Sequence, residues 1–314
     1  MSNLGRIAAL TSLLGLGCKP PPQGVMPICL AEVAAERAQE SESQQLPPDV
    51  WFSIMLRGFD RASLRFPDPP RDCRGAKIRV ETLVGPPSCA DISDPGTPLP
   101  PRPLTPEDLL LTPTADGKML VWVQATHHEG GNATGPVALA EWIDRGIAVR
   151  AIGSLTAQAH KAQLRLESMA EMEILVIESD QCSDPEKPTD CHTLVRLVPL
   201  VDATFRNVAL LDAKGACLGP AVFLLDQSRE DTLENGWTRR FEVVRSLRFE
   251  EGTAEINEQV TIRDSDPAEP DSPSKIYRQA SVRRQLVLDD TGFVTAPGLW
   301  DKMIDEHGSV RPDE

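Results

Sequence analysis

The stretch GWTRRFEVVRSLRFEEGTAEINEQVTIRDSD, Gly236 to Asp266, decides the fold class. Apolar residues such as Phe241 and Val243 alternate in it with arginine and glutamate. A period of two places alternate side chains on opposite faces of a strand. Such alternation is typical of antiparallel sheet with one face in water. Together with KIYRQASVRRQLVLDD, Lys275 to Asp290, the stretch predicts an up-and-down meander.

Strand signals also fill the region before this meander. KMLVWVQAT, Lys118 to Thr126, predicts a strand, and VALAEWI, Val137 to Ile143, predicts its hairpin partner beyond the turn at residues 129–132. Further apolar runs of strand length continue to Leu225, with little helix between them. The chain is therefore predicted to be all-β and mainly antiparallel, as a sandwich or a curved open barrel.

The region before Trp51 has a different composition. Cys29 to Gln45 is rich in alanine and glutamate and predicts a short N-terminal helix, which Pro47 and Pro48 would end. Residues 51–314 are then expected to form a single β-rich domain.

The N-terminal segment has the pattern of an export signal. Arg6 is the only charged side chain before Cys18, and Ile7 to Leu16 is an apolar run of ten residues. A membrane span needs roughly twenty residues, whereas this length suits the apolar core of a secretory signal. The run ends in LGLGC, with the small Gly17 directly before Cys18. The segment resembles the signal of bacterial lipoproteins, although their usual aliphatic residue three before the cysteine is here Gly15.

The resemblance implies that residues 1–17 are a signal peptide and that Cys18 carries the lipid anchor. Residues 18–50 would form a tether with the short helix, and Lys19 with the three prolines after it predicts a stiff start. Lysine after the lipidated cysteine implies sorting to the outer membrane, facing the periplasm or the cell surface. Two alternatives stay open: simple secretion after cleavage by an ordinary signal peptidase, and a cytosolic protein whose N-terminal segment is a buried helix.

The cysteine count agrees with export. The chain has seven cysteines, and six remain if Cys18 carries lipid, which is an even number for disulfides. The expected pairs are Cys182 with Cys191, Cys73 with Cys89, and Cys29 with Cys217. The cysteine spacings are long and include no C-x-x-C pair, so a zinc site is not expected.

Charge and composition exclude several classes of partner. The formal net charge of −15 argues against nucleic acid, because phosphate binding needs a basic surface. It also argues against docking on anionic lipid, so the expected membrane contact is the acyl anchor. Aromatic residues make up only 4% of the chain, which argues against stacked platforms for sugars or bases. No cofactor is expected.

His127-His128-Glu129 is the densest group of residues that can act as ligands or in catalysis. Adjacent histidines on a strand point to opposite faces, so they could share a metal only where the strand breaks. The turn at Gly130-Gly131 allows such a break. A solvated polar turn is the simpler interpretation, so no metal site is predicted and these three residues are kept as candidates. The arginines of the meander, among them Arg245 and Arg284, are expected on exposed faces, paired with glutamates across strands.

Three functions follow. The first is a non-catalytic binding or structural module of the cell envelope, with an envelope protein or ligand as its partner. The second is a carrier of lipid or a small apolar ligand in a curved sheet with an apolar concave face. The third is a hydrolase centred on His127 or His128 with Glu129.

Overall fold

The computed structural model describes residues 26–32, 46–80, 82–86, 89, 95–144, 146–182, 191–250, 252–268, 272–289 and 292–308. Strand makes up 57% of it and helix 8%, which confirms the all-β, mainly antiparallel prediction. The predicted signal peptide and Cys18 lie outside the described residues. No helix of the described part is both long enough and apolar enough to cross a membrane.

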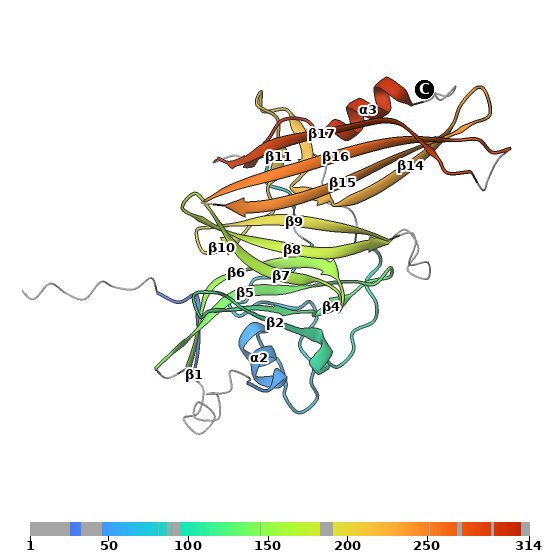
Figure 1. Ribbon diagram of the computed structural model, residues 1–314. Coiled ribbons are helices and arrows are strands. Elements are labelled where there is room, and N and C mark those ends of the chain that lie inside the picture. Colours follow the sequence, from blue (N-terminus) through green and yellow to red (C-terminus); the bar gives the residue numbers. More distant parts are fainter. Residues whose placement is uncertain are drawn as a thin grey trace, which may run out of the picture.

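The first sheet has the strand order β1–β6–β5–β3–β2, with β4 also paired to β5 (Figure 1). Its strands are β1 (Cys29–Glu32), β2 (Leu109–Pro113), β3 (Met119–Val123), β4 (Thr126–His127), β5 (Asn132–Ile143) and β6 (Gly146–Gln158). The antiparallel pairing of β3 with β5 confirms the hairpin partner predicted from the sequence. Helix α2 (Pro48–Met55) packs on one face of this sheet, and a short 3-10 helix, η2 (Pro106–Asp108), leads into β2.

The second sheet has the order β10–β9–β8–β7, with β13 also paired to β9. Its strands are β7 (Gln163–Met169), β8 (Met172–Cys182), β9 (Cys191–Val201), β10 (Thr204–Phe205) and β13 (Val222–Leu224). The third sheet has the order β12–β11–β18–β17–β16–β15–β14. Its strands are β11 (Ala209–Leu211), β12 (Cys217–Pro220), β14 (Asp226–Thr232), β15 (Thr238–Glu250), β16 (Thr253–Ser265), β17 (Lys275–Leu288) and β18 (Gly292–Val294), and helix α3 (Leu299–His307) follows. The predicted meander is confirmed as β15–β16–β17.

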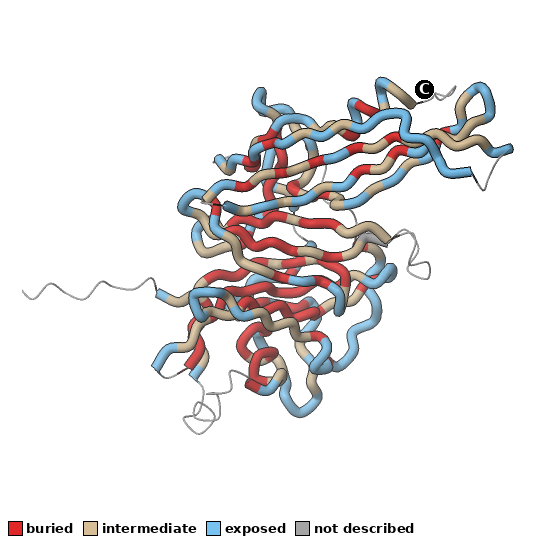
Figure 2. Tube along the Cα trace, viewed as in Figure 1, coloured by how far each residue is buried: buried red, intermediate tan, exposed pale blue. Residues whose placement is uncertain are grey.

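The sheets stack as layers, with α2 at one end and α3 at the other (Figure 1). Successive side chains of β3 point alternately into two different cores, one on each face of the first sheet. Val121 and Val123 join the core beneath α2, whereas Leu120 and Trp122 join the core against the second sheet. All four side chains are fully buried, because this strand has an apolar layer on each face. Buried residues predominate along the strands in the middle of the stack (Figure 2).

The long strands of the third sheet, β15 to β17, are buried on one face only. The same face of β16 carries Ala254 and Ile256, which pack against the second sheet, and Val260 and Ile262, which pack against α3. The opposite face is open and carries polar side chains such as Gln259. The alternation that predicted a sheet with one wet face is therefore confirmed here.

The N-terminal helix predicted from Cys29 is wrong in its described part. Cys29 to Glu32 is strand β1, which pairs with the edge of β6. A helix begins instead at Pro48, one of the residues expected to end one. Proline is well tolerated at the first helical position, because the N–H that it lacks would have no partner there. Residues 33–45 lie outside the described residues.

Two of the predicted disulfide pairs are also wrong. The structure joins Cys29 to Cys73 and Cys89 to Cys217, with Cα–Cα distances of 6.3 and 5.4 Å. Cys29 and Cys73 both pack against the core beneath α2, although 44 residues separate them. Cys191 is disulfide-bonded as well, and Cys182 lies opposite it in the register of β8 with β9.

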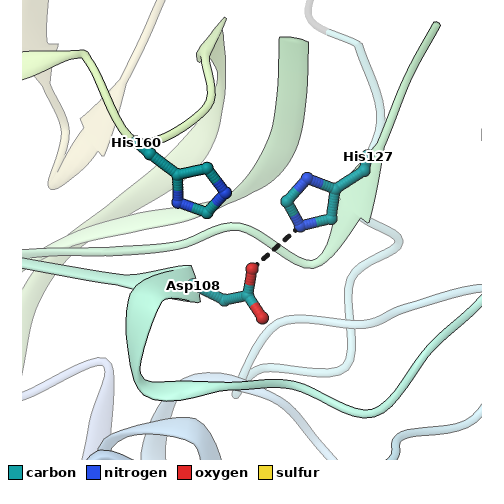
Figure 3. Close-up of side chains that lie close together, drawn as sticks. All are labelled: Asp108, His127 and His160. Atoms are coloured by element: carbon teal, nitrogen blue, oxygen red, sulfur yellow. Dashed lines mark hydrogen bonds and ion pairs between the residues drawn. The ribbon is translucent and has the colours of Figure 1, made fainter. Parts of the chain in front are cut away.

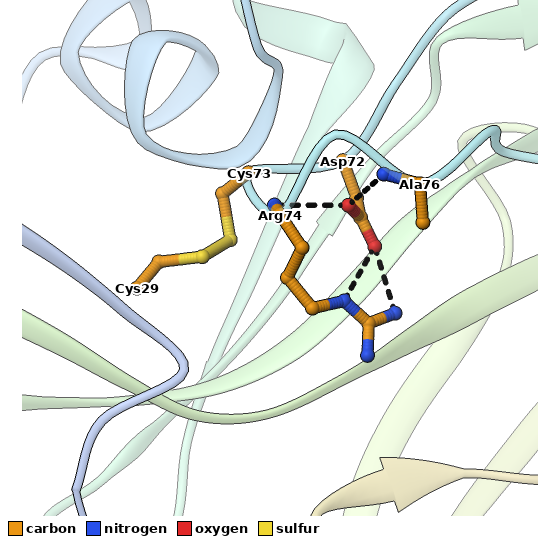
Figure 4. Close-up of a disulfide and its surroundings, with 5 residues drawn as sticks. All are labelled: Cys29, Asp72, Cys73, Arg74 and Ala76. Atoms are coloured by element: carbon orange, nitrogen blue, oxygen red, sulfur yellow. Dashed lines mark hydrogen bonds and ion pairs between the residues drawn. A yellow bond between two sulfur atoms is a disulfide. The ribbon is translucent and has the colours of Figure 1, made fainter.

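Local hydrogen bonds explain how the paired cysteines meet. The buried Asp72 carboxylate accepts the backbone N–H groups of Arg74 and Ala76 at 2.9 Å each, and this shapes the turn that presents Cys73 (Figure 4). At the other bridge, the Val84 N–H donates to Asn207 O, which sets the segment before Cys89 beside β11. Spacing along the chain reveals neither contact.

Candidate functional site

The structure separates the three candidate residues at the end of β4. The buried His128 ring lies 3.1 Å from Gly96 O through Nδ1 and 2.8 Å from Thr134 Oγ1 through Nε2. Glu129 is exposed. The His127 ring is on the other side of the strand, as alternation requires. A site made of these three residues is therefore not formed.

His127 instead meets two residues that the sequence did not associate with it, Asp108 and His160 (Figure 3). Its Nε2 donates to Asp108 Oδ1 at 2.9 Å, and its ring stacks on His160 with centroids 5.8 Å apart. His160 sits in a turn after β6 with φ of 61° and is oriented by Glu107 O, 3.0 Å from its Nδ1. One ligand atom from each of the three side chains lies within 4.8 Å of the others.

Asp108 is the centre of this group, and its side chain is fully buried. Arg102 donates to both carboxylate oxygens, from Nη1 at 2.8 Å and from Nη2 at 2.6 Å. The Thr105 N–H donates at 2.7 Å and closes a capping box on η2. Burial by itself would raise the pKa of Asp108, but the hydrogen bonds from His127, Arg102 and Thr105 outweigh it and hold that pKa well below its usual range.

These contacts limit the chemistry of the group. One carboxylate and two imidazoles are a suitable ligand set for zinc or a similar ion. A cation would have to displace the Arg102 guanidinium from Asp108, because that pair already occupies both oxygens. The geometry therefore supports a buried ion-pair cluster that holds η2 against β4. The helical turn that begins at Thr105 was evident in the sequence, but its contact with His160 was not, because 52 positions separate Asp108 from His160.

A hollow of about 670 Å³ lies on the open face of the third sheet. It runs across β15, β16 and β17, and the residues lining it include Val244, Ser246, Asn257, Gln259, Ser281 and Arg283. Hydroxyl, amide and guanidinium groups predominate in this set. With Val244 and Val282 also in its lining, the hollow is mixed in character, and it is not the mainly apolar wall that the predicted lipid carrier needs.

The opposite face of the same sheet holds a buried ionic cluster of Arg245, Glu258 and Arg284. The expectation that these arginines are exposed is wrong, because their side chains are only 12% and 6% exposed. Their burial could have been predicted from the alternation itself, because residues two apart on a strand lie on the same face. Arg245 lies two residues after the buried Val243 and therefore points to the same side of β15. The cross-strand pairing with glutamate is confirmed.

No family model matches the chain, and no curated protein or solved structure is significantly similar to it.

Proposed function

We propose that the protein is a lipid-anchored module of the bacterial cell envelope that binds a partner and catalyses no reaction. The disulfides of a β-rich domain carry this proposal. Disulfides persist mainly in oxidising compartments, such as the periplasm and the cell surface. The signal-like residues 1–17 and Cys18 support acylation, and Lys19 supports sorting to the outer membrane.

The open face of the third sheet is the binding surface in this proposal. Ser246, Gln259 and Ser281 line its hollow with groups that both donate and accept hydrogen bonds. A face of this kind suits a polar surface of an envelope protein better than a lipid chain.

The contacts of His127 favour binding over hydrolysis. Its Nε2 lies 2.9 Å from Asp108 Oδ1 and 2.9 Å from Arg102 Nη2. A general base must hydrogen-bond the proton that it removes, and a third group must orient it. Both contacts fall on Nε2, so this nitrogen belongs to the ion-pair cluster and is not free to take a proton from a substrate.

The anchor is tested by labelling cells with a palmitate analogue. The full chain should take up label and fractionate with the outer membrane, and Cys18→Ser should abolish both. Cys29→Ser is the matched control and should keep the label. Unlabelled full chain in the soluble fraction, with its thiols freely alkylated, would contradict the proposal.

The binding surface is tested with a photo-crosslinking residue placed at Gln259, in the hollow, or at Glu306, which is exposed on α3. We expect one discrete adduct from position 259 in intact cells and none from position 306. Equal adducts at both positions, or none at either, would contradict binding at the open face.

A further inference from the structure

A second pocket lies on the buried side of the third sheet, between the core shared with the second sheet and the core beneath α3. It is an open recess of about 320 Å³, bounded by β12, β13 and the start of α3. Its apolar lining includes Leu210, Leu218, Phe223 and Trp300. Small-molecule sites span about 300–1,000 Å³, so the pocket has the size for one small ligand.

Arg245 and Arg284 line this pocket, and one carboxylate serves both. Glu258 Oε2 lies 2.8 Å from Arg284 Nη2 and 3.3 Å from Arg245 Nε. Its other oxygen accepts the N–H groups of Leu299 and Trp300, at 2.9 and 2.7 Å, and so caps α3. This buried cluster therefore holds two positive groups and one negative group.

The two arginines have more donors than the cluster uses. Arg284 Nη1 donates to Ala296 O at 2.6 Å, and Arg245 Nη1 donates to Leu224 O at 2.9 Å. Arg284 Nε is buried with no hydrogen-bond partner. Since each guanidinium has five N–H groups, several remain for a ligand. Desolvation lowers the pKa of Arg284, and the attraction of Glu258 does not fully offset it.

The remaining polar residues of the lining are Gln227 and Asp301. Asp301 is exposed on the first turn of α3, where a carboxylate is favoured by the helix dipole. The excess positive charge, from Arg245 and Arg284, therefore lies at the buried floor of the pocket, and the acidic Asp301 lies at its exposed rim.

We propose that this pocket binds a small carboxylate with a short apolar tail. The carboxylate pairs with Arg245 and Arg284, whose planar guanidinium groups suit two-point contact with such an anion. The tail lies against Leu218 and Phe223. Binding balances the charge that Glu258 leaves unmatched, and the apolar walls disfavour a hydrated inorganic anion. The site lies on the opposite face of the sheet from the open-face hollow, although Arg245 contributes to the lining of both, and it does not depend on the lipid anchor.

Titration calorimetry of the purified full chain with hexanoate tests this proposal. Hexanamide has the same tail without the charge, and sulfate has charge without a tail. We expect hexanoate to bind at least about tenfold more tightly than either, since tenfold corresponds to 1.4 kcal/mol and charged hydrogen bonds exceed that. No hexanoate binding, or equal binding of hexanamide, would overturn the proposal.

Variants locate the site. Leu218→Trp, at a position that is 40% exposed, fills the mouth without touching the ionic cluster and should weaken hexanoate at least about tenfold. Arg245→Gln should weaken it by at least as much. Arg240→Gln, on the same strand but outside the pocket lining, is the control and should bind like the wild type. If Arg245→Gln does not fold, the Leu218→Trp variant still tests the site. Hexanoate affinity unchanged by Leu218→Trp would overturn the proposal.

Discussion

Replacement of Asp108 by alanine tests whether the ion-pair cluster at η2 stabilises the fold. The carboxylate is fully buried and accepts hydrogen bonds from Arg102, Thr105 and His127. A hydrogen bond to a charged group contributes about 1.5–3 kcal/mol, and a lost helix cap costs about 1 kcal/mol. The Arg102 side chain is 42% exposed, so water can replace part of the hydrogen bonding that Arg102 loses with the carboxylate. We therefore expect Asp108→Ala to lower the free energy of unfolding by about 3 kcal/mol.

The same cluster predicts a pH dependence. Because the folded pKa of Asp108 lies below its unfolded value, the ionised carboxylate stabilises the fold at any pH above the unfolded pKa, about 4. This contribution is lost as the pH falls from there toward the folded pKa. The isosteric Asp108→Asn should therefore be less stable than the wild type at pH 7, by about 2 kcal/mol, and the gap should narrow at pH 3.

Urea unfolding with intact disulfides, followed by tryptophan fluorescence at pH 7, 5 and 3, measures both effects. Asp202→Asn is the matched control, because Asp202 forms only an exposed ion pair with Arg206, and it should change stability by less than about 0.5 kcal/mol. A loss below about 1 kcal/mol for Asp108→Ala, or a gap for Asp108→Asn that does not narrow at pH 3, would refute the reasoning.

Three further changes test other parts of the fold. A Cβ at Gly135 would lie 1.6 Å from Val123 O, so Gly135→Ala should cost at least about 3 kcal/mol in thermal or urea unfolding. In the control Gly117→Ala, the added Cβ has no atom within 4 Å, and only the positive φ of 82° opposes it. This change should cost about 1–2 kcal/mol. Removing the bridge with Cys89→Ser and Cys217→Ser together should lower stability by about 2–5 kcal/mol, and dithiothreitol should then have a smaller effect than on the wild type. Glu258→Gln leaves two buried arginines without a counter-ion and should cost about 3–5 kcal/mol in the same assay; a cost near zero would show that water reaches the cluster.

Much of the candidate chemistry could not be predicted from the sequence. The cluster around Asp108 joins residues from η2, β4 and the turn after β6, and only the packing of these elements brings His127 and His160 within reach. The disulfide pairs depend on which segments run side by side, for example Val84 beside β11, and spacing along the chain carries no trace of that. Of the three candidates at residues 127–129, only His127 lies in this cluster, and the sequence did not indicate its partners.

The sequence by itself determined the strands of the meander and the alternation of their two faces. A strand with one wet face needs polar and apolar residues in alternation, so the meander from Thr238 to Leu288 is evident in the order of its side chains. Alternation identifies the inward side of a strand but not what covers it. Only the tertiary structure decided that α3 covers one half of that face and the second sheet the other, with Arg245, Glu258 and Arg284 buried at the boundary. The physical reason is that the alternation is a local property of each strand, whereas burial and charge pairing depend on contacts between segments far apart in the chain.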